Sequence, residues 1–190
     1  NVLSMFIPKN AKIISVEDTR ELQLPHENWI PSVTRIGFTK EYGEVTMFDL
    51  LKESFRQSPD YVIVGEVRGA EAYVLFQGMA AGMPSIGTMH AGKVEDLIHR
   101  LETPPISLSP TLIETLDMVL VMVHARMKGE SSRRLKEVVE IESVDATTGV
   151  ARTNRVYSWL PEFDTFEKRG YSWVLQKISK NKGISLLNSI

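Results

Sequence analysis

Residues 61–69 read Tyr-Val-Ile-Val-Gly-Glu-Val-Arg-Gly, and this stretch carries the strongest strand signal of the chain. A run of four β-branched or aromatic residues is typical of a strand covered on both faces, as the central strands of parallel sheets are. Gly65 interrupts the run and places Glu66 just beyond it. The sequence therefore predicts a buried strand over residues 61–64 that is followed at its carboxyl end by a carboxylate.

Strands and helices alternate on both sides of this stretch. Lys-Ile-Ile-Ser-Val at residues 12–16 predicts a second buried strand, and shorter strands are expected at residues 32–38 and 84–89. Helical periodicity is found at residues 46–57, 70–81 and 94–101. Alternation at this spacing predicts an α/β fold with a mostly parallel sheet flanked by helices.

The last third of the chain has a different pattern. A strand is expected at residues 117–123, and residues 134–143 and 150–159 predict a β-hairpin joined through Asp-Ala-Thr-Thr-Gly at residues 145–149. Residues 171–178 form a weak amphipathic helix pattern, and the polar residues 179–190 are expected to fray. An antiparallel extension is therefore expected to follow the parallel sheet.

Composition excludes several classes of protein. The 22 Lys and Arg residues against 24 Asp and Glu residues give a formal net charge of −2, which excludes a strongly basic protein that binds nucleic acid mainly through phosphate contacts. The absence of cysteine excludes disulfides, thiolate nucleophiles and Cys-ligated zinc. No apolar run approaches the roughly 20 residues of a membrane-spanning helix, so membrane association is expected only through partners.

Polar side chains follow three of the predicted strands at their carboxyl ends. These residues are Glu17 and Asp18, Glu66 and Arg68, and Thr88 and His90. Ligands of open α/β sheets bind beyond the carboxyl ends of the strands, and a carboxylate fixed there can reach a hydrated metal ion or an attacking water. If the three strands are neighbours, the pattern favours a Mg²⁺-nucleotide site. The alternative is that each polar residue only meets solvent or caps the next helix.

A phosphate-binding loop is nearly matched by Gly-Thr-Met-His-Ala-Gly-Lys-Val at residues 87–94. The stretch fits G-x-x-x-x-G-K-[ST] except at Val94, which has no oxygen to offer Mg²⁺. It also follows the acidic strands, whereas the phosphate loop of the P-loop folds precedes them. We therefore interpret this stretch as a decoy and not as a phosphate loop.

Three segments, in order, resemble the motifs of the secretion ATPases. Residues 14–22 with 25–29 resemble the acidic box, residues 55–69 the Walker B segment, and residues 87–92 the histidine box. Residues 136–141 and 153–159 are similar to the C-terminal hairpin of the archaeal branch, which drives archaellum assembly and rotation and type IV-like pili, next to type II secretion. The likeness covers roughly residues 1–160.

This resemblance implies a RecA-like motor domain that acts as a homo-hexameric ring and binds ATP and Mg²⁺ between subunits. It implies that Glu17 positions or deprotonates the attacking water, that Glu66 holds Mg²⁺ through its water shell, and that His90 senses or polarises the γ-phosphate region. Arg20, Arg35 and Arg56 are candidates for stabilising transition-state charge, including from a neighbouring subunit. The other implied cofactor-binding residues are Asp18, Arg68 and Thr88.

The chain departs from the family in one respect. The family's phosphate loop lies immediately before the helix whose end residues 1–6 resemble, so the expectation is a C-terminal piece of a motor that lacks this loop. Residues 1–160 would form the motor domain and residues 161–190 a C-terminal helix and tail. The resemblance further implies a membrane platform protein as partner, no direct nucleic-acid contact, and a cytoplasmic location at the inner face of the membrane.

Three functions remain open from the sequence. The first is an ATP-hydrolysing motor that assembles or secretes extracellular filaments, through an archaellum, type IV pilus or type II secretion-like system. The second is a non-catalytic subunit-interaction module, which the missing phosphate loop favours. The third is a DNA-handling ATPase of the conjugation type, against which the acidic composition weighs.

Overall fold

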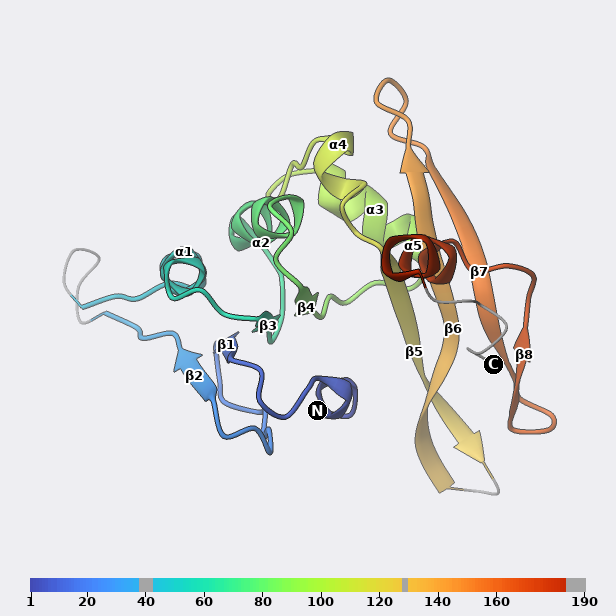
Figure 1. Cartoon of the computed structure of the whole chain (residues 1–190), viewed down its shortest axis with the longest axis horizontal. Helices are drawn as coiled ribbons and strands as arrows, with labels where there is room; N and C mark the ends of the chain where they lie inside the picture. Colours follow the sequence, from blue (N-terminus) through green and yellow to red (C-terminus); the bar gives the residue numbers. More distant parts are fainter. Residues whose placement is uncertain (38–42, 128–129, 184–190) are drawn as a thin grey trace. The chain divides into compact units, whose positions relative to one another are not determined.

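The computed structural model describes residues 1–37, 43–127 and 130–183. The chain divides into two compact units, a first unit of residues 1–90 and 100–108 and a second unit of residues 91–99 and 109–190. The elements in chain order (Figure 1) are η1 (Leu3–Phe6), β1 (Ile13–Glu17), β2 (Trp29–Val33), α1 (Met47–Arg56), β3 (Tyr61–Val64), α2 (Glu71–Ala80), β4 (Ser85–Gly87), α3 (Val94–Glu102), α4 (Pro110–Ile113), β5 (Met118–Met127), β6 (Glu130–Val144), β7 (Ala151–Leu160), β8 (Thr165–Lys168) and α5 (Trp173–Lys182).

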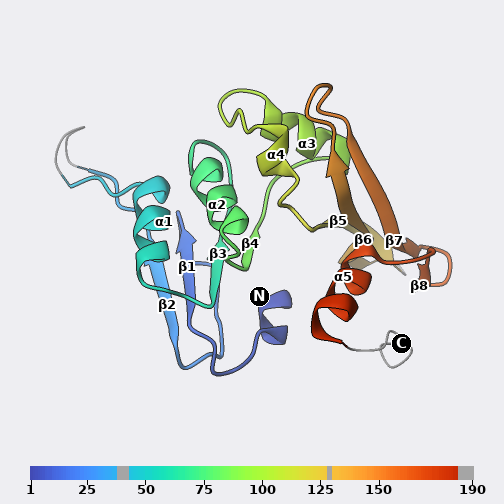
Figure 2. The same ribbon diagram turned by 45° about the horizontal axis from the view of Figure 1, so that its top comes forward.

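The first unit is built on a parallel sheet with the strand order β2-β1-β3-β4. Every residue of β1 is buried, as are Val62, Ile63 and Val64 of β3, which explains the continuous apolar runs in the sequence. Helix α1 packs against β1 and β2, and α2 packs against β4 (Figure 2). The prediction of a parallel sheet with flanking helices is therefore confirmed.

Helix α1 begins at a capping box. The Thr46 side chain accepts a hydrogen bond from the Asp49 backbone N–H, and the Asp49 carboxylate accepts one from the Thr46 backbone N–H. These two bonds satisfy backbone donors that a helix start would otherwise leave free. The helix packs against β1 and β2, with Leu51 fully buried.

The contact between α1 and α2 depends on Gly78. A Cβ atom at this position would lie 2.2 Å from the Phe55 ring, which is closer than any real van der Waals contact. On an open helix surface, Gly→Ala stabilises a protein by about 1 kcal/mol. At position 78 we expect the opposite sign, because the ring must be displaced within a packed interface.

We therefore expect Gly78→Ala to lower the free energy of unfolding by about 1 to 2 kcal/mol, as measured by urea denaturation. The double variant Phe55→Leu/Gly78→Ala should unfold at a higher urea concentration than Phe55→Leu alone, because the smaller side chain leaves room for the new methyl group. A single Gly78→Ala variant that is more stable than the wild type would contradict this account of the interface.

The second unit contains an antiparallel sheet with the order β5-β6-β7-β8. Strand β6 pairs with β5 on one side and with β7 on the other. The register of these two pairings shifts at three places, as it does at β-bulges. Buried side chains of this sheet include Val121, Val139, Ile141 and Val156. The predicted hairpin through residues 145–149 is confirmed.

Some element boundaries differ from the sequence predictions. Strand β2 covers Trp29–Val33 and not residues 32–38, because its pairing with β1 begins at Trp29, opposite Ile13. Beyond β2, Arg35 forms an isolated antiparallel bridge to Val45. The end of that predicted strand, residue 38, lies outside the described residues. Helix α4 and strand β8 were not expected, since each has four residues and every residue of β8 is exposed. Neither is long enough to give a periodic signal.

Both ends of the described chain also differ from expectation. Residues 3–6 form a 3₁₀ helix and not the end of an α-helix. Helix α5 continues to Lys182, so residues 179–182 are helical where fraying was predicted; Gly183 ends the helix in the left-handed conformation that glycine favours, with φ 63°. Residues 184–190 of that predicted tail lie outside the described residues. No helix within the described ranges is long and apolar enough to cross a membrane.

Candidate functional site

The three strands whose ends carry the candidate residues are adjacent in the sheet. Strand β3 pairs in parallel with β1 on one side and with β4 on the other, so their carboxyl ends meet at one edge. Glu17, Glu66 and Thr88 therefore stand side by side in the first unit, each at or just beyond a strand end. The condition that the sequence prediction placed on this site is met.

Glu66 is the centre of a charged cluster at this edge. Its Oε2 accepts a hydrogen bond from the Arg68 guanidinium, and its Oε1 lies 3.6 Å from His90 Nε2. The other side of the Arg68 guanidinium faces Asp18, with 3.6 Å between Nη1 and Oδ2. The cluster thus joins residues that follow β1, β3 and β4, and it keeps contact with solvent, since the His90 side chain is 88% exposed.

The electrostatics of the cluster favour an ionised Glu66. The hydrogen bond from Arg68 holds the pKa of Glu66 below its usual range. Partial burial raises this pKa, whereas the charges of Arg68, His90 and Arg100 lower it further. The same bond raises the pKa of Arg68. Glu66 is therefore a carboxylate at neutral pH, the form that metal ions and their water ligands bind.

Glu17 lies in a different environment from Glu66. Its side chain is buried, with 2% of the residue exposed, and Oε1 accepts hydrogen bonds of 3.0 Å from the backbone N–H groups of Glu21 and Leu22. Oε2 is buried and accepts no hydrogen bond from any residue in the described ranges. No ion pair between Glu17 and the Glu66 cluster is found in that part of the chain.

Side-chain hydrogen bonds fix the loops around the cluster, and two of the residues that make them, Glu71 and Arg100, were not predicted from the sequence. Glu71 Oε1 accepts from the backbone N–H groups of Arg68 and Gly69. Arg100 donates to the carbonyl oxygen of His90, and the predicted Thr88 donates its hydroxyl to the carbonyl oxygen of Gly65. Glu71 is the first residue of α2, directly after the N-cap Ala70, so no capping-box pattern in the sequence marks it.

The three arginines considered for a role at the nucleotide form contacts with residues that are not part of this cluster. Arg20 stacks over the Trp29 ring at 5.1 Å from its centroid, and Arg35 donates to the carbonyl oxygen of Gly43. Arg56 pairs with Glu53 on α1 at 3.5 Å. The structure therefore brings Asp18, Glu66, Arg68 and His90 together, whereas the contacts that these arginines form are to other residues.

The stretch at residues 87–94, which nearly matches a phosphate loop, has carboxylates at the position where a phosphate would bind. A Cβ atom on Gly92 would lie 3.1 Å from Asp96 Oδ2, and Lys93 Nζ lies 4.0 Å from Asp96 Oδ1. Glu95 and Asp96 both stand in the first turn of α3. Carboxylates at a helix N-terminus occupy the position that favours a bound anion, which agrees with the interpretation of this stretch as a decoy.

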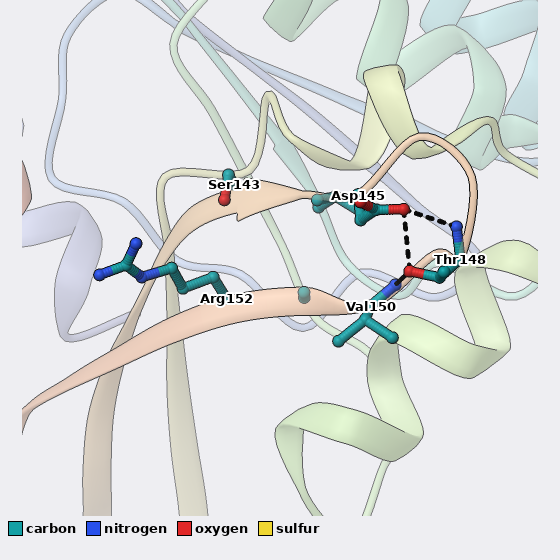
Figure 3. Close-up of a pocket in the computed structure, with 7 residues that line it drawn as sticks. Ser143, Asp145, Thr148, Val150 and Arg152 are labelled. Atoms are coloured by element: carbon teal, nitrogen blue, oxygen red, sulfur yellow. Dashed lines mark hydrogen bonds between the residues drawn. The ribbon is translucent and has the colours of Figure 1, made fainter.

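A surface pocket lies at the β6–β7 turn and is lined by Ser143, Val144, Asp145, Thr148, Val150, Ala151 and Arg152 (Figure 3). Asp145 Oδ1 accepts hydrogen bonds from the backbone N–H groups of Thr147 and Thr148 and from the Thr148 hydroxyl. These bonds lower the pKa of Asp145 and stabilise the turn. The polar groups of this pocket thus serve the hairpin, and none of the predicted site residues lines it.

The fit of a nucleotide-bound Mg²⁺ to the Glu66 cluster can be judged from its donor set. No group of three or more His, Asp or Glu side chains with metal-binding geometry exists within the described ranges. A Mg²⁺ ion held mainly by phosphate oxygens and water takes only one or two carboxylates from the protein. The cluster therefore fits contact with Mg²⁺ through water, with most of the ligands coming from the nucleotide.

Residues 1–156 match the family model described as type II/IV secretion system protein. The uncharacterized protein MJ1287 of Methanocaldococcus jannaschii is 44% identical over 185 residues, which cover 97% of this chain and 68% of that protein. The type IV secretion system protein PtlH of Bordetella pertussis is 30% identical over 153 residues, 74% of this chain and 44% of PtlH.

Among solved structures, the chain is similar to the VirB11 ATPase of the Brucella suis type IV secretion system, crystallised in complex with sulphate. The TM-score is 0.58 at 29% identity, over 72% of this chain and 42% of that one. The chain thus spans less than half the length of PtlH and of the crystallised VirB11. Its parallel sheet, flanking helices and antiparallel extension form an α/β fold of the RecA-like secretion ATPase type. The chain belongs to the type II/IV secretion system protein family.

Proposed function

We propose that the chain is part of an ATP-hydrolysing motor subunit that powers the assembly or secretion of extracellular filaments. The observation that carries the proposal is the meeting of Asp18, Glu66, Arg68 and His90 at the carboxyl edge of three adjacent parallel strands. This is the edge at which open α/β sheets bind ligands. The named relatives of the chain include an ATPase of a type IV secretion system.

In this proposal the residues of the cluster have separate roles. Glu66, ionised and fixed beyond β3, holds Mg²⁺ through a water molecule, and His90, exposed beside it, meets the γ-phosphate region. Mg²⁺ supplies charge neutralisation on the phosphate oxygens. Thr88 fixes the strand ends by its bond to Gly65, and Arg68 supplies positive charge. Arg20, Arg35 and Arg56 remain candidates for contacts to the nucleotide of a neighbouring subunit.

The phosphate-binding backbone of the site would come from outside these 190 residues. In support, the stretch at residues 87–94 has Val in place of the Mg²⁺-binding hydroxyl and carries Asp96 beside Gly92. We further propose a homo-hexameric assembly, a membrane platform protein as partner, and a cytoplasmic position at the inner face of the membrane. An archaellum, a type IV pilus and a type II secretion-like system all fit this description.

Phosphate release by the full-length protein tests the proposal. We expect ATP hydrolysis that requires Mg²⁺ and is not increased by DNA. A protein that binds its partner subunits and releases no phosphate would contradict the motor function and support an interaction module. Hydrolysis that needs DNA, with binding that weakens steeply as salt is raised, would instead support a conjugation-type ATPase.

A further inference from the structure

Strands β5 and β6 form a two-stranded ribbon at residues 122–127 and 130–136. In the described part of the chain these residues of β6 pair only with β5, because the pairing of β6 with β7 begins at Glu137. Strand β5 is also an edge strand of the antiparallel sheet (Figure 1), and none of the other described strands pairs with its outer side. An edge strand presents backbone N–H and C=O groups that are free to pair with another extended chain.

One face of this ribbon carries basic side chains. Side chains along a strand alternate between two faces, and Met122, His124 and Arg126 of β5 are exposed, whereas the residues between them are less exposed. In the pairing with β6, His124 stands opposite Arg133 and Arg126 stands opposite Ser131. Arg126 and Arg133 are therefore diagonal neighbours on one exposed face, with His124 beside both.

Arg126 and Arg133 differ from the other arginines of the chain. Each of the others contacts a carboxylate, a backbone carbonyl oxygen or an aromatic ring. Within the described ranges, the guanidinium groups of Arg126 and Arg133 form no hydrogen bond or ion pair. Like charges at neighbouring positions of a sheet repel each other. A bound anion would relieve this repulsion, so the face favours an acidic ligand.

The opposite face of the ribbon is fixed to the rest of the sheet. Arg134, the residue after Arg133, donates hydrogen bonds of 2.9 and 3.0 Å to the Asp164 carboxylate in the turn between β7 and β8. The indole N–H of Trp159 donates to the same carboxylate at 2.9 Å. These bonds lower the pKa of Asp164, so the carboxylate is ionised at neutral pH. Because successive residues of a strand point to opposite faces, the fixed Arg134 directs Arg133 toward solvent.

The charges of the ribbon favour an acidic peptide over a membrane or a nucleic acid. Anionic lipid surfaces are recognised by clusters of about 4 to 8 Lys or Arg residues, whereas the described residues of the ribbon leave only Arg126, Arg133 and Lys136 without a partner. The formal net charge of −2 weighs against nucleic acid. Arginine binds a carboxylate through two parallel hydrogen bonds, and the carboxylates of an extended peptide can be spaced to match a strand.

We propose that the β5–β6 ribbon binds an extended acidic segment of a partner protein. The segment pairs with the outer side of β5 as a further strand, which places every second side chain on the face of Arg126. Its carboxylates bind Arg126 on the neighbouring strand and Arg133 one strand further, since long side chains reach beyond the directly opposite position. This site is separate from the edge of the parallel sheet at Glu66, so the inference does not depend on the proposed function.

Fluorescence anisotropy with the full-length protein and a labelled peptide of alternating glutamate and threonine tests the inference. We expect saturable binding that the double variant Arg126→Gln/Arg133→Gln weakens by about tenfold or more, because charge-assisted hydrogen bonds to carboxylates are lost. A peptide of the same composition with its glutamates in one block should bind about fivefold more weakly, since strand pairing presents only alternate residues to one face. Arg169→Gln is the matched control, because Arg169 already pairs with Glu167 at 2.9 Å, and its affinity should stay within about twofold of wild type.

Three results would overturn the inference. The first is no binding of the alternating peptide at about 1 mM, the limit of weak specific association. The second is equal binding by the wild type and the double variant. The third is preferential binding of phosphatidylglycerol vesicles or of a DNA oligonucleotide, lost in the double variant and not displaced by the peptide, which would assign the face to phosphate groups. The assay needs no turnover, so its outcome is independent of whether the full-length protein hydrolyses ATP.

Discussion

Glu66→Gln should lower the kcat for ATP hydrolysis by the full-length protein by about 10²- to 10³-fold, while nucleotide affinity stays within about threefold. Glu66 is fixed at the end of β3, and Arg68 lowers its pKa, so a negative charge is present at neutral pH. Glutamine keeps the size of the side chain and one acceptor oxygen, and it removes the charge by replacing the other oxygen with an NH2 donor. The loss is therefore expected in the step that depends on Mg²⁺ and not in the folding of the site.

Glu95→Gln provides a matched control for this experiment. Glu95 is an exposed residue of the first turn of α3, and the same chemical change there should leave kcat unchanged. Hydrolysis should be followed as phosphate release, and nucleotide affinity by calorimetric titration with Mg·ATPγS. Normal turnover in Glu66→Gln, or an equal loss in both variants, would refute the role assigned to Glu66.

Glu140→Ala should lower the free energy of unfolding of the 190-residue chain by about 2 to 3 kcal/mol. Glu140 is buried in β6, and its carboxylate accepts hydrogen bonds from the Ser172 hydroxyl, the Trp173 backbone N–H at 2.6 Å and the Asn154 side-chain amide at 3.4 Å. The first two donors form the start of α5, where a negative charge is also favoured by the helix dipole. Alanine leaves these donors without partners and detaches the start of α5 from the sheet.

Urea denaturation followed by circular dichroism measures this effect. Glu140→Gln should lose less stability than Glu140→Ala, because its amide oxygen still accepts hydrogen bonds. Glu167→Ala serves as the control, since Glu167 pairs with Arg169 on the surface, where such pairs contribute little. If Glu140→Ala unfolds at the same urea concentration as Glu167→Ala, the buried carboxylate does not hold α5.

The parallel sheet could be predicted from the sequence because its central strands are buried on both faces. The runs at residues 13–16 and 61–64 are apolar almost without interruption, as is typical of strands covered on both faces. Strand β2 was placed three residues too late, since its residues are only partly buried and contain Pro31. Strand β8 could not be predicted, because all four of its residues are exposed and only pairing with β7 makes it a strand.

For the candidate site, the sequence predicted which residues follow the strand ends, but not which strands are neighbours or which way each side chain turns. The adjacency of β1, β3 and β4 was a condition of that prediction, and the strand pairing in the structure meets it. The burial of Glu17 depends on how the loop after β1 folds back, and the stacking of Arg20 on Trp29 depends on the pairing of β2. Both are tertiary effects that no local pattern records.

The central claim is that the edge of the sheet at Glu66 handles the nucleotide and its metal ion, and a structure of the full-length protein with Mg·ATPγS tests it most directly. We predict a Glu66 carboxylate oxygen at about 4 to 5 Å from Mg²⁺, the distance that one bridging water allows, with His90 beside the γ-phosphate. A nucleotide bound elsewhere, with Glu66 more than about 10 Å from the metal ion, would contradict the claim.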